Sequence, residues 1–259
     1  MADRPTIARL REVTQPLDIR GRRNSEHWTA DVYQRRLSPY LTRLLIATSI
    51  TANGVTCLMI VSGVAAGAAL LIPGLLGALL AAFLAQLQML WDCCDGEVAR
   101  WRGTSSPVGF FLDKVGHYAA ESAIPLALGV RADGGLDSIG GWTTLGALLA
   151  VAIVLNKALN DAVHVARAVN GLPRLEDRAE SVAPRTTLLR RLRGLARFVP
   201  FHRAYHSVEL TLLALLAAVG DAVTGDLQVT RLLVAVLLPA AMFTLVGHFV
   251  AIMSSGRLR

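Results

Sequence analysis

Three aspartates and one histidine stand at helical spacing in the middle of this chain. Asp92 and Asp95 follow directly on an apolar run, and Asp113 and His117 open the next one. Residues three or four positions apart share a face of a helix, so each pair would present its side chains together. Carboxylates beside a membrane-embedded segment are energetically costly and usually serve a function. These four residues are therefore the first candidates for a functional site.

The charge of these residues favours a hard divalent cation. If the two helix ends face each other, three carboxylates share one pocket and repel each other unless a cation binds between them. Oxygen ligands that are open to solvent on one side suit Mg²⁺ or Mn²⁺ better than a structural zinc ion. Such a cation, with Arg100 beside it, suits a pyrophosphate substrate, because it bridges phosphate oxygens and offsets the charge on the leaving group. The alternative is that each aspartate is only a solvated charge at a helix end.

Small residues accompany the acids. Gly96 and Gly109 leave the backbone open, so that a nucleotide or a neighbouring helix can approach closely, and Ala99 serves the same purpose. The three cysteines show no metal-ligand spacing. The adjacent Cys93 and Cys94 are interpreted as small apolar fillers between the acids.

The composition indicates a membrane protein. Of the 259 residues, 53% are hydrophobic and 17% are charged, which is less charge than a soluble globular chain of this length carries. Apolar runs of about 20 residues are long enough to cross a bilayer as helices. The net charge of +7 is therefore interpreted as a topology signal, and no nucleic-acid partner is expected.

The apolar runs predict an all-α integral membrane protein with six transmembrane helices. The predicted spans cover residues 55–71, 75–91, 107–130, 142–165, 208–223 and 229–252. The second span leads directly into Asp92, and the third carries Asp113 and His117 on its first turns. We expect two parts, which are a cytoplasmic N-terminal segment at residues 1–52 and a six-span membrane domain at residues 53–259.

The N-terminal segment is basic and amphipathic. Apolar residues such as Tyr33, Leu37 and Leu44 recur at helical spacing, with Arg36 and Arg43 between them. This pattern predicts one or two helices on the membrane surface. The alternative is a partner-binding helix of a soluble domain. The segment has no apolar signal core, so no cleaved signal peptide is expected.

Arginines are unevenly distributed along the chain. Residues 1–52 hold nine and the connection between the fourth and fifth spans holds eight, whereas the opposite connections hold Arg131 and Arg231. The positive-inside rule then puts both termini and the acidic residues on the cytoplasmic side. The heavy use of arginine and alanine favours a bacterial source and its plasma (inner) membrane. The basic stretch 185–203 is expected to meet anionic lipid headgroups.

A polar stripe on the fourth span is a candidate acceptor site. It consists of Asn156, Lys157, Asn160, Asp161, His164 and Arg167. Polar side chains in a span usually face the bundle interior or a cavity, so the stripe could bind an acceptor or a phosphate. The alternative is a Lys157–Asp161 pair with neighbours that extend to the interface. His206 and Glu209 are further candidates, and His248 is expected to be hydrogen-bonded in the interior.

Two stretches resemble a known family. The central residues read D-x2-D-G-x2-A-R-x8-G-x3-D-x3-H, from Asp92 to His117. This resembles the signature of the CDP-alcohol phosphotransferases, whose last position is normally Asp. The stretch from Asn53 to Thr56, just before the first span, resembles the family's PN-x-(V/I)-T segment, although Ala52 replaces the proline.

The resemblance implies a reaction and a site. An acceptor hydroxyl would attack the β-phosphorus of a CDP-linked donor, form a phosphodiester and release CMP, as in phospholipid synthesis. Asp92, Asp95 and Asp113 would hold a pair of Mg²⁺ or Mn²⁺ ions. The remaining candidates would shape the cytidine and pyrophosphate site; they are Asn53, Thr56, Gly96, Ala99, Arg100, Gly109 and Lys157. CDP-diacylglycerol is the expected donor, the acceptor alcohol stays open, and membrane lipids are expected neighbours. Family members often form homodimers, which this sequence neither requires nor excludes.

His117 leaves three hypotheses open. It is the general base or a metal ligand of an active enzyme, because a neutral imidazole can do either. Alternatively, the base lies elsewhere. In the third hypothesis the site is degenerate and the chain is a non-catalytic lipid- or nucleotide-binding membrane protein. Membrane prenyltransferases also bind Mg²⁺-pyrophosphate through helical aspartates, but they have more spans and lack the D-G-x2-A-R tail.

Overall fold

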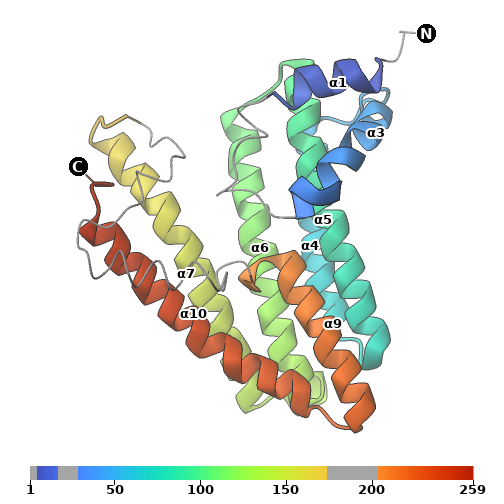
Figure 1. Ribbon diagram of the computed structural model, residues 1–259, viewed down its shortest axis with the longest axis vertical. Coiled ribbons are helices and arrows are strands. Elements are labelled where there is room, and N and C mark those ends of the chain that lie inside the picture. Colours follow the sequence, from blue (N-terminus) through green and yellow to red (C-terminus); the bar gives the residue numbers. More distant parts are fainter. Residues whose placement is uncertain (1–4, 17–28, 174–203, 259) are drawn as a thin grey trace.

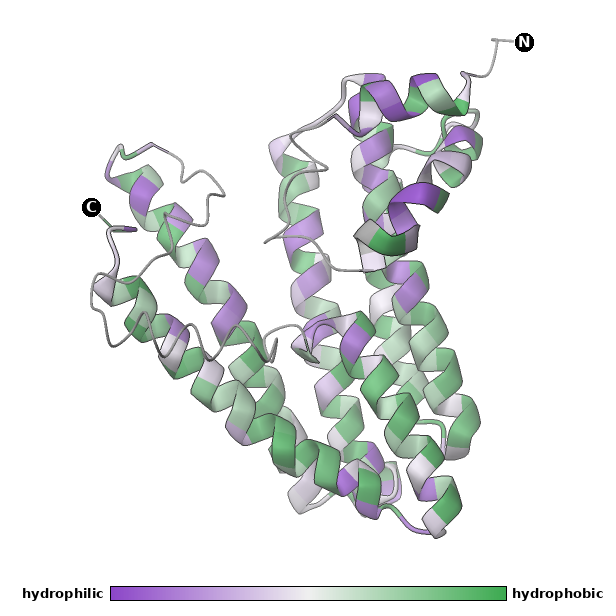
Figure 2. Ribbon diagram, viewed as in Figure 1, coloured by the Kyte–Doolittle hydropathy of each residue, from purple (hydrophilic) through white to green (hydrophobic). Residues whose placement is uncertain are grey.

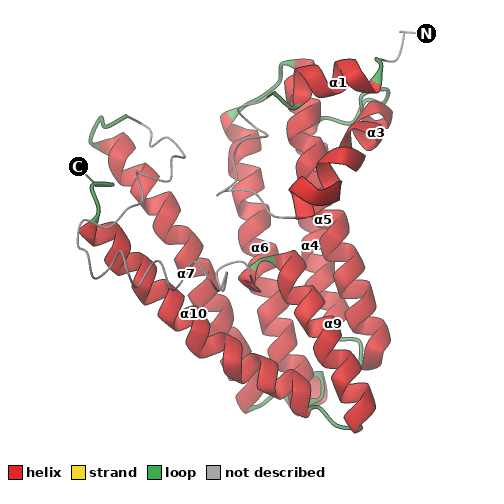
Figure 3. Ribbon diagram, in the orientation of Figure 1, coloured by secondary structure: helices red, strands yellow, loops and turns green. Residues whose placement is uncertain are grey.

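The computed structural model describes residues 5–16, 29–173 and 204–258. Within these ranges the secondary structure is helical and contains no strand (Figure 3). The prediction of an all-α chain is therefore confirmed. The basic stretch 185–203, expected to contact lipid headgroups, lies outside the described residues.

Six long helices contain the predicted spans. They are α4 (Ala52–Leu70), α5 (Gly74–Arg102), α6 (Pro107–Asp133), α7 (Gly141–Val169), α9 (Ser207–Thr224) and α10 (Gln228–Ser254). Four short elements complete the described chain; they are α1 (Ile7–Thr14), the π-helical turn η1 (Ala30–Gln34), α3 (Arg35–Leu45) and the 3-10 turn η2 (Leu136–Ser138). The helix α5 does not stop at the predicted end of the second span but continues through the acidic motif to Arg102.

Five of the long helices are long and apolar enough to cross a membrane, namely α4, α5, α7, α9 and α10. This supports a multi-pass membrane protein. The helix α6 is 27 residues long but is not among the five. Asp113, Lys114 and Glu121 lie within it and lower its hydropathy. Six spans therefore stay a prediction.

The helices form a bundle that opens toward one end (Figure 1). The helix α6 contacts both α4 and α7, and α5 contacts α4 and α9. In Figure 1, α7 and α10 pack along each other and diverge from α6 toward the upper end of the view. Hydrophilic residues gather at this upper end on α1, α3, α5 and α6 (Figure 2).

Small residues let α4 and α6 approach closely. A Cβ atom at Gly63 would lie 2.6 Å from the Cβ of Ala120, and one at Gly67 would lie 2.9 Å from the backbone of Ala123. Helices in membranes commonly pack through such small residues, because the backbones can then come into contact. The contact fixes α4 beside the helices that carry the acidic motif.

The connection between α5 and α6 is short and well defined. Gly103 ends α5 in the left-handed region at φ 64°, where glycine is strongly favoured. The Ser106 hydroxyl caps α6 by accepting a hydrogen bond from the Gly109 amide at 3.1 Å, and Pro107 occupies the first turn. Asp95 and Asp113 are therefore carried on adjacent, antiparallel helix ends.

Candidate metal and donor site

An acidic cluster forms where α5 meets α6. The Nε2 atom of His117 lies 3.1 Å from Oδ1 of Asp92 and 3.5 Å from Oδ1 of Asp113. One ligand atom from each of the three residues lies within 4.8 Å of the others. Asp92 is 21 positions before Asp113 in the sequence, and the two residues meet because the helix ends that carry them face each other.

The donor set fits a divalent cation. It offers two carboxylates and one imidazole, and the side chains of Asp92 and Asp113 are 24% and 34% exposed. Two carboxylates beside one imidazole carry a net negative charge, which a cation can neutralise. The partial exposure leaves room for water or phosphate oxygens in the coordination sphere, as Mg²⁺ and Mn²⁺ require. These three residues could therefore hold the metal.

Asp95 has a different partner. Its Oδ2 accepts a hydrogen bond from the Thr56 hydroxyl of α4 at 2.7 Å. Thr56 is buried, so this hydrogen bond orients Asp95 from the protein side. The sequence places both residues among the site candidates, and the structure brings them together beside the cluster.

Two glycines of the motif lie under side chains of other site candidates. A Cβ atom at Gly96 would lie 3.0 Å from Nη1 of Arg100, and one at Gly109 would lie 3.1 Å from Oδ1 of Asn53. The glycines therefore leave space for these two polar side chains in this structure. Ala99 is half-buried on the same face of α5 as Asp92 and Asp95.

Lys157 binds a partner that sequence reasoning missed. Its Nζ donates to Oε1 of Glu121 at 2.7 Å, and Nδ1 of His206 lies 3.3 Å from the same oxygen. Glu121 is 3% exposed and joins α6, α7 and α9. The available signal was the i, i+4 series of Asp113, His117 and Glu121 along α6.

The alternative interpretation of the stripe, a Lys157–Asp161 pair, is wrong. Asp161 accepts hydrogen bonds from Lys114 at 2.9 Å and from the Tyr118 hydroxyl at 2.8 Å, both on α6. The reason is that α7 packs directly against α6, so these partners across the helix interface replace a pairing along α7.

The outer part of the polar stripe holds α7 to the C-terminal region. Asn156 hydrogen-bonds Nδ1 of His248 at 2.9 Å, as expected for an interior histidine. Arg167 donates to the Arg257 carbonyl at 2.7 Å, and Arg257 reaches Asn160 at 3.4 Å. His164 is exposed. The contacts of Asn156, Asn160 and Arg167 thus differ from those of Lys157, which faces α6.

Glu97, inside the motif, also went unnoticed in the sequence. It is fully buried, and its carboxylate accepts hydrogen bonds from three side chains of the N-terminal helices. It lies on the face of α5 opposite to the acidic cluster, together with Cys93, Cys94 and Val98, which are also buried. One face of the motif helix thus carries the acidic cluster, and the opposite face packs against the N-terminal helices.

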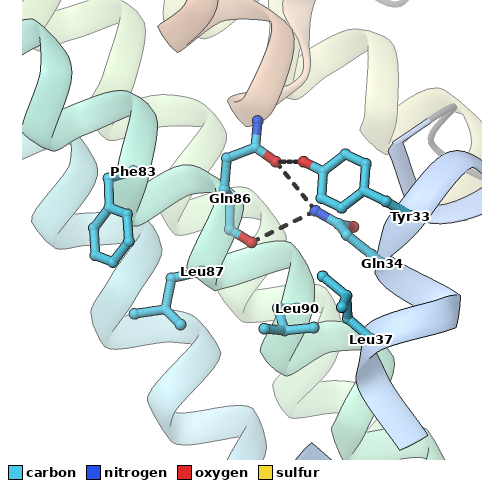
Figure 4. Close-up of a pocket in the computed structure, with 7 residues that line it drawn as sticks. All are labelled: Tyr33, Gln34, Leu37, Phe83, Gln86, Leu87 and Leu90. Carbon is cyan, nitrogen blue, oxygen red and sulfur yellow. Dashed lines mark hydrogen bonds between the residues drawn. The ribbon is translucent and has the colours of Figure 1, made fainter. Parts of the chain in front are cut away.

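A small pocket lies elsewhere on α5, against η1 and α3 (Figure 4). Gln86 accepts a hydrogen bond from the Tyr33 hydroxyl, and Gln34 donates to the same amide oxygen at 3.3 Å. The rest of the lining is apolar, from Leu37, Phe83, Leu87 and Leu90. None of the motif residues lines this pocket, so it is separate from the acidic cluster.

Comparison with known proteins adds one finding. A family model described as CDP-alcohol phosphatidyltransferase matches residues 49–254, a range that runs from just before α4 to the end of α10. No curated protein matches the chain. The acidic cluster, Thr56 and the Glu121–Lys157 pair all lie within the matched range.

Proposed function

Because the chain belongs to the CDP-alcohol phosphatidyltransferase family, we propose that it moves a phosphatidyl or related phospho-alcohol group from a CDP-linked donor to a hydroxyl acceptor. The family acts in membrane lipid synthesis. The acidic cluster of Asp92, Asp113 and His117, inside the matched range, is the observation that carries the proposal. CDP-diacylglycerol is the proposed donor, since the long apolar helices put the site in reach of a membrane lipid.

The metal site follows from the same residues. Members of the family are generally dependent on divalent metal ions. We assign Asp92, Asp95 and Asp113 as ligands of Mg²⁺ or Mn²⁺, with Thr56 orienting Asp95 through its hydroxyl. When bound, such a cation supplies charge neutralisation at the pyrophosphate and at the leaving CMP. Arg100 and Asn53, which lie over the two motif glycines, are assigned to donor binding.

His117 is the proposed general base. If Nε2 carries the ring hydrogen, it donates to Oδ1 of Asp92, and Nδ1 then keeps the lone pair. The acceptor oxygen forms a bond to the β-phosphorus, the phosphoanhydride bond to CMP breaks, and Nδ1 takes the hydroxyl proton. A histidine that binds metal through Nε2 carries its hydrogen on Nδ1 and cannot accept this proton. The base and ligand roles therefore exclude each other.

The proposed topology has six spans, which are the five long apolar helices and α6. The acidic cluster and both termini lie on the cytoplasmic side of a bacterial plasma membrane. The arginine-rich N-terminal segment supports this orientation. At the opposite end, Arg131 donates to the carbonyls of Ile72 and Gly74. The short helix α3 would lie at the membrane surface, since Leu37, Tyr40 and Leu44 are exposed on it. The domain boundary near residue 52 would separate this surface segment from the bundle.

The test is CMP release by the purified protein. Incubation with CDP-diacylglycerol, Mn²⁺ and a pool of alcohols should yield CMP, and mass spectrometry of the lipid product would identify the acceptor. We expect His117→Ala to lower the rate by about a hundredfold or more, and His117→Asp to retain part of it. Full activity of the alanine variant would contradict the base assignment.

One observation favours a second function. By the resemblance to the family signature, His117 stands in place of an aspartate, which would remove one negative charge from the site. A chain with a degenerate site would bind the CDP-linked lipid without turnover. Donor binding in the presence of Mn²⁺, with no CMP released for any acceptor, would support this function over the transferase.

A further inference from the structure

The first helix of the chain touches the acidic motif. The carbonyl of Thr14, at the C-terminal end of α1, accepts a hydrogen bond from Nε of Arg100 at 2.6 Å. Carbonyls at a helix end lack partners within the helix, and the end of the helix dipole there favours a cation. The Arg100 side chain is thus held from the N-terminal segment, while its terminal nitrogens lie across Gly96.

The next residue, Gln15, connects α1 to Glu97. Its Nε2 donates to Oε1 of Glu97 at 2.7 Å. The Ser38 hydroxyl donates to the same oxygen at 2.5 Å, and the Thr42 hydroxyl donates to Oε2 at 2.6 Å. All four of these residues are buried, with exposed fractions of 4% or less. A buried carboxylate with three such donors is well satisfied and fixes the positions of the groups around it.

Pro39 of α3 gives the Gln15 amide a second acceptor. Pro39 lies inside α3 and has no amide hydrogen for the carbonyl of Arg35, four residues earlier. Gln15 fills this vacancy, because its Nε2 also lies 2.9 Å from the Arg35 oxygen. One amide group therefore serves two acceptors, the freed carbonyl of α3 and the buried carboxylate of α5.

We propose that Glu97 is a positioning residue of the donor site. It docks α1 through Gln15, and the docked helix end holds Arg100 across Gly96. The inference rests on the proposed function, since the group that Arg100 then meets is the pyrophosphate of a CDP-linked donor. A fixed guanidinium binds this group more tightly than a mobile one, because less side-chain freedom is lost on binding.

The experiment compares donor binding in full-length variants. Gln15→Glu puts a second carboxylate against Glu97 and should release α1, and we expect the Kd for CDP-diacylglycerol, measured with Mn²⁺, to rise about tenfold. Glu97→Gln in the same chain removes the repulsion between the two carboxylates and should recover part of the affinity, because the Arg35 carbonyl still lacks the donor that Gln15 supplied. Ala8→Glu adds the same charge to the exposed side of α1 and should leave the Kd unchanged.

A second measurement separates positioning from general damage. The affinity for Mn²⁺ alone, measured by calorimetry without donor, should be equal in the wild type and in Gln15→Glu. Loss of Mn²⁺ binding together with donor binding, or failure of the double variant to recover, would overturn the proposal. An unchanged donor Kd in Gln15→Glu would overturn it as well.

The two proposals fail in different ways. Donor binding by the wild type without CMP release would contradict the transferase and leave the role of Glu97 standing, provided that the Kd differences appear. CMP release together with an unchanged Kd in Gln15→Glu would contradict only the role of Glu97. A wild type that does not bind a CDP-linked donor would contradict both.

Discussion

Two charged clusters on α6 differ in their balance. One turn separates His117, which contacts Asp92 and Asp113, from Glu121, which contacts Lys157 and His206. In the first cluster two carboxylates meet one imidazole, and in the second one carboxylate meets an ammonium group and an imidazole. The second cluster closes on itself and links three helices. The first cluster has one carboxylate more than it has imidazoles, and a bound cation would balance this charge.

Burial differs in the same direction. The side chain of Glu121 is 3% exposed, whereas that of Asp113 is 34% exposed. A buried charge is stable only when it is paired, and an open cluster of like charges can recruit a cation. The same residue types therefore serve structure or chemistry according to their charge balance and their access to solvent.

The largest effect is expected from Asp113→Asn. The change removes one carboxylate from the open cluster, and we expect the rate of CMP release to fall about a thousandfold, because metal coordination supplies several kcal/mol at the transition state. The fold should be retained, as judged by thermal unfolding. Asp137→Asn, which changes an exposed acid in η2, is the matched control and should keep the wild-type rate. Comparable losses in the two variants would contradict the site.

Glu121→Gln should act on stability instead. It leaves the Lys157 ammonium without its carboxylate, and breaking a buried pair in this way costs about 3 kcal/mol. The measurement is the unfolding free energy in detergent. Glu12→Gln breaks the exposed Arg9–Glu12 pair and should cost about 0.5 kcal/mol or less. If Glu121→Gln combined with Lys157→Met recovers the unfolding free energy, the unpaired ammonium causes the loss. A Glu121→Gln protein as stable as the wild type would contradict the structural role of the second cluster.

Stabilisation by Mn²⁺ should differ between variants of the two clusters, with a smaller effect than the two changes above. At Mn²⁺ concentrations about 100 times the Kd, the wild type should gain about 2.7 kcal/mol of stability, since the cation binds the folded state. Asp92→Asn should lose most of this gain. Glu121→Gln should gain as much as the wild type does, although its unfolding free energy without Mn²⁺ is lower. The readout is the unfolding midpoint with and without Mn²⁺, and chelation by EDTA should reverse the shift. An equal gain in the Asp92 variant would place the cation elsewhere.

The smallest effect is expected at Thr56. Thr56→Val removes the hydrogen bond to Asp95, which is worth about 1 kcal/mol, so the KM for Mn²⁺ should rise about fivefold. Thr56→Ser keeps the hydroxyl and should stay close to the wild type. Thr144→Val, which removes a hydroxyl that donates to the Gly140 carbonyl at the start of α7, controls for the loss of a threonine. Equal behaviour of the valine and serine variants would contradict the orienting role.

The sequence predicted local features well. The long helices and the helical register of Asp92 and Asp113 follow from periodicity, which acts within a few residues. The pairing of Lys157 was missed, because it depends on how α7 is rotated against α6. Glu97 was missed for a similar reason, since its donors on α1 and α3 are more than fifty residues away along the chain. Contacts between helices need the packed structure.

The unbroken length of α5 has a kinetic consequence. Its 29 residues extend about 43 Å, which exceeds the roughly 30 Å of a bilayer's hydrocarbon core. In the proposed topology, Asp92 and Asp95 would lie near the end of the hydrocarbon core, where this helix reaches the lipid headgroups. A lipid-linked donor would arrive there by lateral diffusion, and a water-soluble acceptor would arrive from the bulk. Turnover should then follow the mole fraction of donor in the membrane, and dilution with inert lipid would slow the reaction at a constant total donor concentration.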